Sequence, residues 1–243
     1  MIQTEGIFSG GSDIAAPIIG KDFNWTGGDG TYQVLDDGGE NWRIKFLSSG
    51  TFTPLRNMVI DAFLVGAGGC KGCTHCGAGG SGYTTTVRSI VLAANTAYQI
   101  TIGAAGINPT KAGTDGVDGG TTSAFAASAL GGKGSLAGSS SARKPGADGG
   151  SGGGGVNISG VHVNSSTAAG GTDGEDGATA TTAGGTGQGT TTREFGETDG
   201  DLYASGGGDN LTATVPNSGN GGAYNVEPAD GIVVIRQHKE VAA

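Results

Sequence analysis

The stretch AFLVGAGGCKGCTHCGAGGSGY, residues 62–83, decides the fold expected for this chain. It begins as a continuous apolar run, the pattern of a buried strand, and then changes into glycine-rich sequence that holds all three cysteines of the protein. Glycine has no side chain to bury and loses more backbone entropy on ordering than any other residue. The stretch is therefore a candidate metal site, a candidate phosphate-binding loop or a piece of architecture.

Glycine dominates the whole composition. It supplies 53 of the 243 residues, roughly three times its usual share of about 7%. The chain has 13 Lys and Arg against 22 Asp and Glu, and its net charge of -9 disfavours nucleic acid as a partner. It shows neither a signal-peptide pattern nor an apolar stretch of membrane-spanning length, so we expect synthesis in a cytoplasm without membrane insertion.

Strand patterns flank the glycine-rich part. Segments 32–35 and 41–47 lie on either side of DDGG, a sequence that favours a hairpin turn. Segments 58–65, 83–91 and 97–103 read as further strands, with a short turn at residues 94–95, and GIVVIRQH at 231–238 reads as an internal strand. Only TSAFAASAL at 122–130 suggests a short helical turn.

A three-residue period appears between residues 103 and 223. Glycine recurs at every third position in GTDGVDG (113–119), GTDGEDG (171–177) and GADGGSGGGG (146–155). Three residues per turn without internal hydrogen bonds is the geometry of polyproline II. Collagen shares this period but needs long proline-rich runs, and this chain has 6 prolines in total. The pattern predicts a bundle of extended helices that hydrogen-bond to one another.

These observations predict an all-β, sandwich-like domain with a glycine-rich, polyglycine-II-like middle. The closing strand at 231–236 should pair near residues 60–65, which brings the N-terminal and C-terminal strands together. Residues 1–30 are expected to form an N-terminal extension that serves as an attachment segment, and residues 31–243 the glycine-rich β domain.

The order of motifs carries a resemblance to a known family. NWRIKF, VGAGG, GYT, YQITIGAAG, GGTTSAF, GQGTTTREFGE, LYASGGG and GIVVIR follow one another between residues 41 and 236. Together they resemble the glycine-rich domain of bacteriophage tail proteins and prophage-encoded adhesins, with GQGTTTREFGE (187–197) and GIVVIR (231–236) as the most specific parts. In the tip adhesins of T-even-like tail fibres, such domains form a sandwich of polyglycine-II helices whose distal loops touch the host.

The resemblance implies a structural protein of a virion, most simply a tail-fibre or receptor-binding adhesin that recognises the bacterial surface without covalent chemistry. The implied partners are other virion proteins (a fibre shaft, baseplate or capsid) and a bacterial surface receptor. A homotrimer and a monomer capping a trimeric shaft both agree with the chain. The alternative is a purely architectural virion protein, such as a capsid fibre or decoration protein, without its own receptor.

The cysteine loop departs from a plain glycine tract. Cys70, Cys73, His75 and Cys76 offer three thiolates and an imidazole, ligands that suit zinc or iron. Strong zinc sites usually combine ligands from two separate segments, and here ligands from symmetry-related chains would complete such a site. The alternative is that these small residues only fill a loop in a reducing compartment.

Other chemistry finds little support in the sequence. Gly66–Gly69 follows a strand, but no GK[ST] and no helix follow it, as a phosphate-binding loop requires. The Asp-Gly repeats do not match calcium-loop spacings and suit turns instead. Glu194 and Glu197 are candidate acids for hydrolysis, yet neighbouring acids are usually solvated. We expect no enzyme activity.

Receptor contact is the remaining role, because binding usually resides in exposed loops on a rigid scaffold. Three polar segments, 139–145, 156–166 and 211–217, differ most from the glycine pattern. The predicted contact residues in them are Arg143, Lys144, Asn157, His162, Asn164, Thr214 and Asn217. The alternative is that these segments are plain connections.

Overall fold

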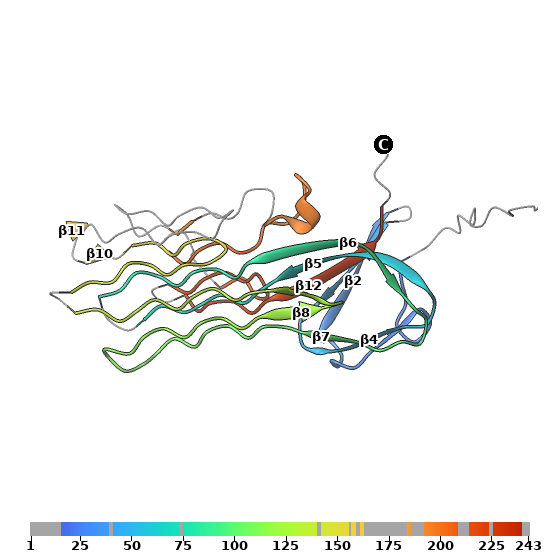
Figure 1. The fold of residues 1–243 in the computed structure, drawn as a ribbon, viewed down its shortest axis with the longest axis horizontal. Coiled ribbons are helices and arrows are strands. Elements are labelled where there is room, and N and C mark those ends of the chain that lie inside the picture. The colour runs from blue at the N-terminus through green and yellow to red at the C-terminus, as the bar shows by residue number, and fades with distance from the viewer. Residues whose placement is uncertain are drawn as a thin grey trace, which may run out of the picture.

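The computed structural model of the protein is all-β, as predicted (Figure 1). The described residues are 16–38, 41–72, 75–139, 142–155, 157–158, 161–162, 184–185, 192–208, 214–223 and 226–239. Among them the only helical element is the 3-10 turn η1 (Glu194–Gly196), and none of the helical structure is long and apolar enough to cross a membrane.

Two five-stranded antiparallel sheets form one end of the molecule. The first has the order β1 (Phe23–Trp25), β4 (Gly50–Pro54), β7 (Tyr98–Thr101), β8 (Thr122–Ala124) and β9 (Ala127–Ala129). The second has the order β2 (Tyr32–Gly38), β3 (Asn41–Phe46), β12 (Ile232–Gln237), β5 (Met58–Val65) and β6 (Thr84–Leu92). A separate hairpin joins β10 (Asn157–Ile158) to β11 (Val161–His162).

The core lies between the two sheets. In β3 the alternate residues Trp42, Ile44 and Phe46 are buried and face the first sheet, as their alternation predicts. The Phe46 ring packs against Trp25 of β1 and Phe52 of β4, with ring centroids 4.7 and 5.5 Å apart. Large aromatic side chains on both inner faces therefore hold the sandwich together.

The predicted closure by the C-terminal strand is confirmed. β12 pairs antiparallel with β5 on one side and with β3 on the other, so that Ile235 lies opposite both Ala62 and Ile44. β2 and β3 form the predicted hairpin. All of β12 except its last residue is buried, which agrees with its continuous β-branched sequence.

Two expectations need correction. Segment 122–130 forms the β8–β9 hairpin and no helical turn. Phe125 and Ala126, both at positive φ (51° and 61°), make a two-residue turn whose twist suits antiparallel strands.

The first sheet also begins before residue 31. Phe23 is fully buried, and β1 pairs with β4, so these residues are part of the sandwich because their aromatic side chains complete its core. Residues 1–15 lie outside the described chain.

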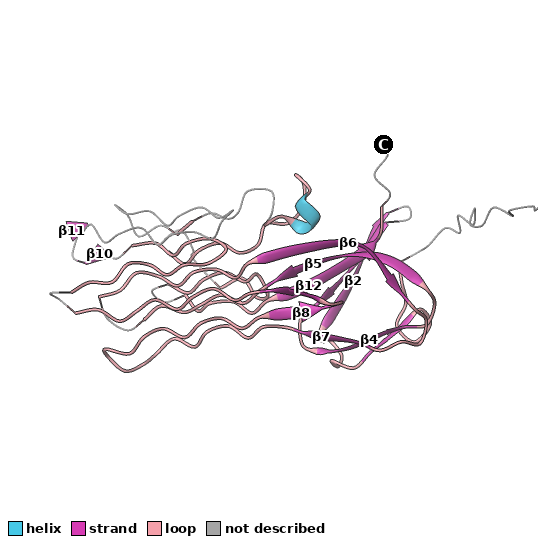
Figure 2. Cartoon of the chain, in the orientation of Figure 1, coloured by secondary structure: helices cyan, strands magenta, loops and turns pink. Residues whose placement is uncertain are grey.

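The strands continue into a long bundle of extended segments (Figures 1 and 2). The chain leaves β5, runs out along the bundle and returns to β6; the connection from β7 to β8 does the same. The bundle is thus built from the β5–β6 and β7–β8 connections, which join neighbouring strands, and from the long connection between β9 of the first sheet and β12 of the second. We refer to its far end as the distal end.

Backbone hydrogen bonds in the bundle point in three directions. Ala78, Gly79 and Gly80 donate to the carbonyls of Gly154, Gly222 and Lys133, at 2.9, 2.8 and 3.0 Å. The next three residues repeat this order, because Ser81, Gly82 and Tyr83 donate to Ser151, Gly219 and Leu130 at 3.0, 2.9 and 2.8 Å. A strand alternates between two neighbours, whereas this period of three is that of polyglycine-II packing, as the glycine spacing predicted.

The close spacing of these segments requires glycine. A Cβ built on Gly82 would lie 1.9 Å from the carbonyl oxygen of Gly66, and one on Gly68 would lie 1.8 Å from that of Asn220. Real side chains never approach a backbone oxygen this closely. The missing Cβ atoms therefore allow the lateral hydrogen bonds that satisfy the buried backbone groups.

Replacing Gly68 with alanine should strongly destabilise the protein. The obstacle is backbone, which no rotamer change can move, so we expect the free energy of unfolding to fall by about 3 kcal/mol or more, the upper end for overpacking. Urea denaturation measures the change. Gly113→Ala is the control, because Gly113 has open space around it and a φ of 76°, so only about 1–2 kcal/mol of backbone strain is expected. Equal losses at both positions would contradict the role given to close packing.

Candidate functional site

The distal end is the first candidate site. It lies away from both sheets and is formed by turns of the bundle together with the β10–β11 hairpin (Figure 1). Its described residues include 71–72, 75–77, 107–115, 136–139 and 142–144. The described segments behind these turns are hydrogen-bonded to one another, as where Lys144 donates to the carbonyl of His75 and Gly77 donates to that of Lys144.

The structure brings several predicted contact residues to this end. Lys144 donates its backbone N–H to the carbonyl of His75 at 3.1 Å, so the segment carrying Arg143 and Lys144 lies beside the cysteine loop. Asn157 and His162 are opposite each other in the β10–β11 hairpin. Asn164 lies outside the described residues.

Asn217, from the third predicted segment, does not lie at the distal end. The Asn217 side chain donates hydrogen bonds to the carbonyls of Leu47 and Gly231, at 3.0 and 2.8 Å, where the bundle joins the sheets. Thr214 is exposed and donates through Oγ1 to the carbonyl of Glu227 at 3.0 Å. Asn217 therefore stabilises the junction, and sequence reasoning missed this because its partners are backbone groups remote in the chain.

The two described cysteines are buried and have backbone partners. The Cys70 thiol donates to the carbonyl of Ile107 and accepts the N–H of Val117, both at 2.9 Å. The Cys76 thiol donates to the carbonyl of Gly72 at 2.7 Å, and Lys71 Nζ lies 3.4 Å from its sulfur. Burial raises the pKa of Cys70 above its usual value, against the opposing effect of the Val117 N–H.

The predicted metal site is only partly described. Cys73 lies outside the described residues, and no group of three or more His, Cys, Asp or Glu side chains with metal-binding geometry occurs within the rest. A zinc or iron ion would have to compete with the backbone hydrogen bonds of Cys70 and Cys76. Metal binding by the cysteine loop stays a prediction.

Cys70 and Cys76 should resist alkylation in the native protein. The thiolate is the reactive species, and both sulfurs are buried, so iodoacetamide should label them only after unfolding. Mass spectrometry of labelled peptides assigns each site. Rapid labelling of either cysteine in the folded protein would contradict the packing described above.

Elemental analysis tests the metal prediction. One zinc or iron per chain that is lost in the variant Cys76→Ser supports metal binding by the cysteine loop, whereas protein that contains neither metal after growth with both ions counts against it.

The candidate acids at 194 and 197 lie at the opposite end, on the outer face of the second sheet. Glu194 is 2% exposed and accepts bonds from Lys45 Nζ and the Tyr203 hydroxyl, both at 2.7 Å, and from Arg43. The expectation that both acids are solvated is therefore wrong for Glu194. Burial and the Glu194 carboxylate raise the pKa of Tyr203. This carboxylate is a buried structural anchor for the segment that contains it.

Phe195 and Glu197 attach the same segment to β12. The Phe195 ring is buried, and the Arg236 guanidinium lies 4.1 Å from its centroid. Arg236 also donates to Glu197 at 2.5 Å. Phe195 has a φ of 57°, a conformation that the surrounding contacts hold in place. The sequence REFGE marked this segment as specific but not its partners, which are far away in the chain.

Asp61 on β5 is the buried centre of a second group of charges. It is 0% exposed and accepts bonds from Arg236 Nε at 3.2 Å, the Ser89 N–H at 3.1 Å and His238 Nδ1 at 2.6 Å. Burial opposes ionisation of Asp61, but the hydrogen bonds from His238, Ser89 and Arg236 outweigh it and hold its pKa below the usual value.

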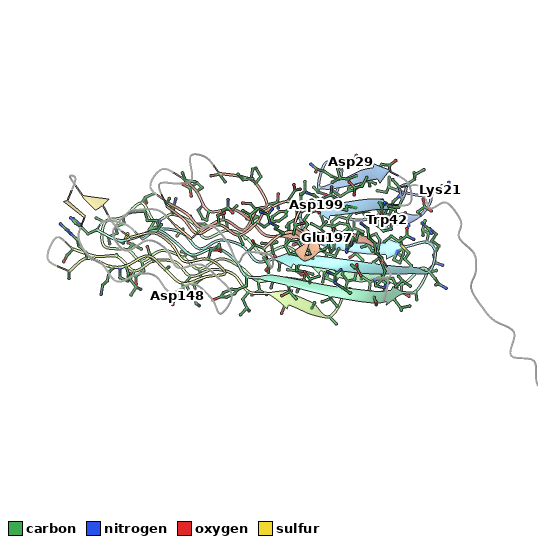
Figure 3. The ribbon with its side chains drawn as sticks, turned by 90° about the horizontal axis from the view of Figure 1, so that it is seen from above. Lys21, Asp29, Trp42, Asp148, Glu197 and Asp199 are labelled. Carbon is green, nitrogen blue, oxygen red and sulfur yellow. The ribbon has the colours of Figure 1, made fainter. Side chains whose placement is uncertain are left out.

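A polar pocket of about 230 Å³ lies beside these groups. Its lining consists of Asp37, Asn41, Trp42, Arg43, Glu194, Phe195, Glu197, Asp199, Gly200, Arg236, Gln237 and Lys239. Figure 3 shows Trp42, Glu197 and Asp199 together at the sheet end, with Asp148 on the bundle. Asp37 and Glu194 pair with Arg43, and Glu197 pairs with Arg236, so these acids link neighbouring segments at the sheet end.

The free energy of unfolding should fall at acidic pH, and part of this fall should depend on Asp61. Its pKa is lower in the folded chain than in the unfolded one, so its contribution is present above the unfolded pKa of about 4 and is lost as pH falls toward the folded value. Asp61→Asn should flatten the loss of unfolding free energy below about pH 4. The variant should keep part of the pH dependence of its unfolding free energy. The remaining part comes from Asp37, Asp118 and Asp201, whose pKa values are also lowered in the folded chain.

Denaturant unfolding between pH 2 and 7 measures this dependence. The control is Asp29→Asn at an exposed position on the sheet end, where Asp29 makes no hydrogen bond or ion pair within the described chain (Figure 3). An acid slope that is equal in the wild type and in Asp61→Asn would show that Asp61 does not contribute.

The fold and its sites define an all-β protein in which a sandwich supports a glycine-rich bundle. Comparison with protein families agrees: the family model of the glycine-rich domain matches residues 47–236. The chain belongs to this glycine-rich domain family. A search of curated proteins finds no match. The match begins after β3, so β1, β2 and β3 of the sandwich precede it.

Proposed function

We propose that this protein is a structural component of a bacteriophage virion, a tail-fibre adhesin that recognises the bacterial surface without covalent chemistry. Two facts support the proposal: membership of the glycine-rich domain family and the order of motifs, which resembles tail proteins and prophage adhesins. The proposed partners are a fibre shaft, baseplate or capsid and a bacterial receptor, with the protein either a homotrimer or a monomer on a trimeric shaft.

One observation carries the proposal. The strands β1 and β12, the first and last of the described chain, both lie in the sheets, whereas the turns of the bundle lie at the distal end (Figure 1). A molecule arranged in this way can be attached at one end and present its turns at the other. Rigid presentation favours binding, because less conformational entropy is lost when a preorganised surface meets its partner.

The alternative is an architectural virion protein without its own receptor. The same dense backbone bonding makes the bundle a stiff spike, and stiffness alone serves a capsid fibre or decoration protein equally well. Binding to cells separates the two functions, because only an adhesin recognises the cell surface.

Labelled full-length protein should bind saturably to some members of a panel of bacterial strains. A variant with segment 156–166 replaced by a glycine-serine sequence of equal length should lose this binding, because the segment includes the β10–β11 hairpin at the distal end. The matched control replaces the exposed β6 residues Thr86 and Val91 with alanine and should bind normally.

Absence of binding to every strain by protein that still assembles into virions would overturn the adhesin proposal and support the architectural alternative. Equal binding by the wild type and by the distal variant would reject segment 156–166 as the contact and assign the contact to another surface. Circular dichroism and thermal unfolding confirm that each variant is folded.

A further inference from the structure

Four residues with basic side chains lie on two neighbouring segments of the distal end. We call Lys71, His75, Arg143 and Lys144 the basic cluster. Lys144 donates its N–H to the carbonyl of His75 at 3.1 Å, and Gly77 donates to the carbonyl of Lys144 at 3.0 Å, which ties the two turns together. Lys71 Nζ lies 3.4 Å from the sulfur of Cys76, a residue that forms a β-bridge with Lys144.

The basic cluster is not neutralised by the described chain. Within the described ranges, no carboxylate forms an ion pair with any of its members. The sheet end is different, because there Arg43 contacts three carboxylates, and Lys45 and Arg236 contact two each. Lys71, Arg143 and Lys144 thus place positive charge without an ion-pair partner in the described chain at the distal end of a protein whose net charge is -9.

Arg143 adds a donor that lacks an acceptor. Its Nε is buried without a hydrogen-bond partner in the described structure, although the residue as a whole is partly exposed. A buried donor left unpaired is unfavourable, and an arriving oxygen atom would remove that cost. The planar guanidinium suits the paired oxygens of a phosphate or carboxylate.

We propose that the basic cluster binds an anionic polysaccharide of the bacterial surface, through phosphate or carboxylate groups spaced along the polymer. Three cationic side chains (Lys71, Arg143 and Lys144) beside His75 on two hydrogen-bonded segments suit a ligand with several charges better than a single small anion. Nucleic acid is disfavoured, because the acidic remainder of the protein repels a densely charged chain. The inference that the ligand lies on a cell surface rests on the adhesin function proposed above. The inference that the site binds a polymer with several negative charges does not depend on that function.

The test measures binding of the full-length protein to three polymers of similar length. Poly(glycerol phosphate), in which spacers separate the charges, represents phosphate; polygalacturonate represents carboxylate, and dextran is neutral. We expect saturable binding to one or both anionic polymers, weaker as salt increases, and none to dextran. The preferred anion distinguishes a phosphorylated from a uronic-acid glycan. Equal binding to dextran, or no binding to either anionic polymer, would overturn the proposal.

Charge-removing variants assign the site. Arg143→Gln combined with Lys144→Gln should weaken binding to the preferred polymer at least tenfold. The matched control combines Lys21→Gln with Lys239→Gln, two exposed lysines at the sheet end without ion pairs in the described chain, and should change the dissociation constant less than twofold. Equal weakening in both double variants would indicate unspecific charge attraction and reject the basic cluster. Melting temperatures within a few degrees of the wild type show that both variants fold.

The same double variants on cells separate this inference from the proposed function. Binding to cells that is unchanged in the Arg143/Lys144 variant leaves the adhesin function intact and rejects the basic cluster as its receptor site. Binding to an anionic polymer without binding to any cell supports the site and counts against the adhesin function. Comparable affinity for DNA of similar length would show an unspecific polyanion site and overturn the assignment to polysaccharide.

Discussion

The structure depends on lateral hydrogen bonds between extended segments that only glycine lets approach closely. In the run from Ala78 to Tyr83, successive backbone N–H groups turn to three neighbours and then repeat the same order. At glycines such as Gly68 and Gly82, a neighbouring carbonyl oxygen stands where a Cβ would otherwise lie. The entropy lost in ordering so many glycines is offset by satisfied backbone groups. The buried aromatic side chains lie between the two sheets and on the outer face of the second sheet.

The sandwich and the bundle stabilise each other. The bundle segments are the connections between strands, so strand pairing fixes where each segment starts, and the bonding of the segments fixes where they end. β12 has a central part in this arrangement, since it closes the second sheet between β3 and β5. On the outer face of that sheet, Arg236 pairs with the buried Asp61 and with the partly exposed Glu197, so that it links β12 to β5 and to the 192–203 segment. Breaking the buried Arg236–Asp61 pair is expected to cost several kcal/mol, because a charge would be left buried without its partner.

The two ends of the molecule treat charge differently. At the sheet end, Arg43 and Lys45 form ion pairs with Glu194. This residue, a candidate acid for hydrolysis in the sequence, thereby links its own segment to β3. At the distal end, Arg143 and Lys144 have no such partners in the described chain. Fixed turns with unpaired charges are suited to recognition, whereas paired and buried charges are suited to stability.

The amino-acid sequence by itself determined the class of the fold and most of its strands. Alternation in β3, the continuous β-branched run of β12 and the glycine period are local patterns, and local patterns suffice to predict local geometry. The β8–β9 hairpin was missed because small residues such as those of TSAFAASAL lack a clear period. The membership of β1 in the sandwich was missed because a strand of three residues carries almost no pattern.

Only the tertiary structure decided which residues meet. Glu194 lies 151 positions from Arg43, and Asp61 lies 175 from Arg236, so no spacing in the chain reveals that they pair. The same holds at the distal end, where Lys144 joins the loop that carries His75, while Asn217, expected beside them, stabilises the junction instead. The physical reason is that hydrogen bonds between segments of the bundle join residues far apart along the chain. Glycine spacing predicts that such bonds form, but it does not specify their partners.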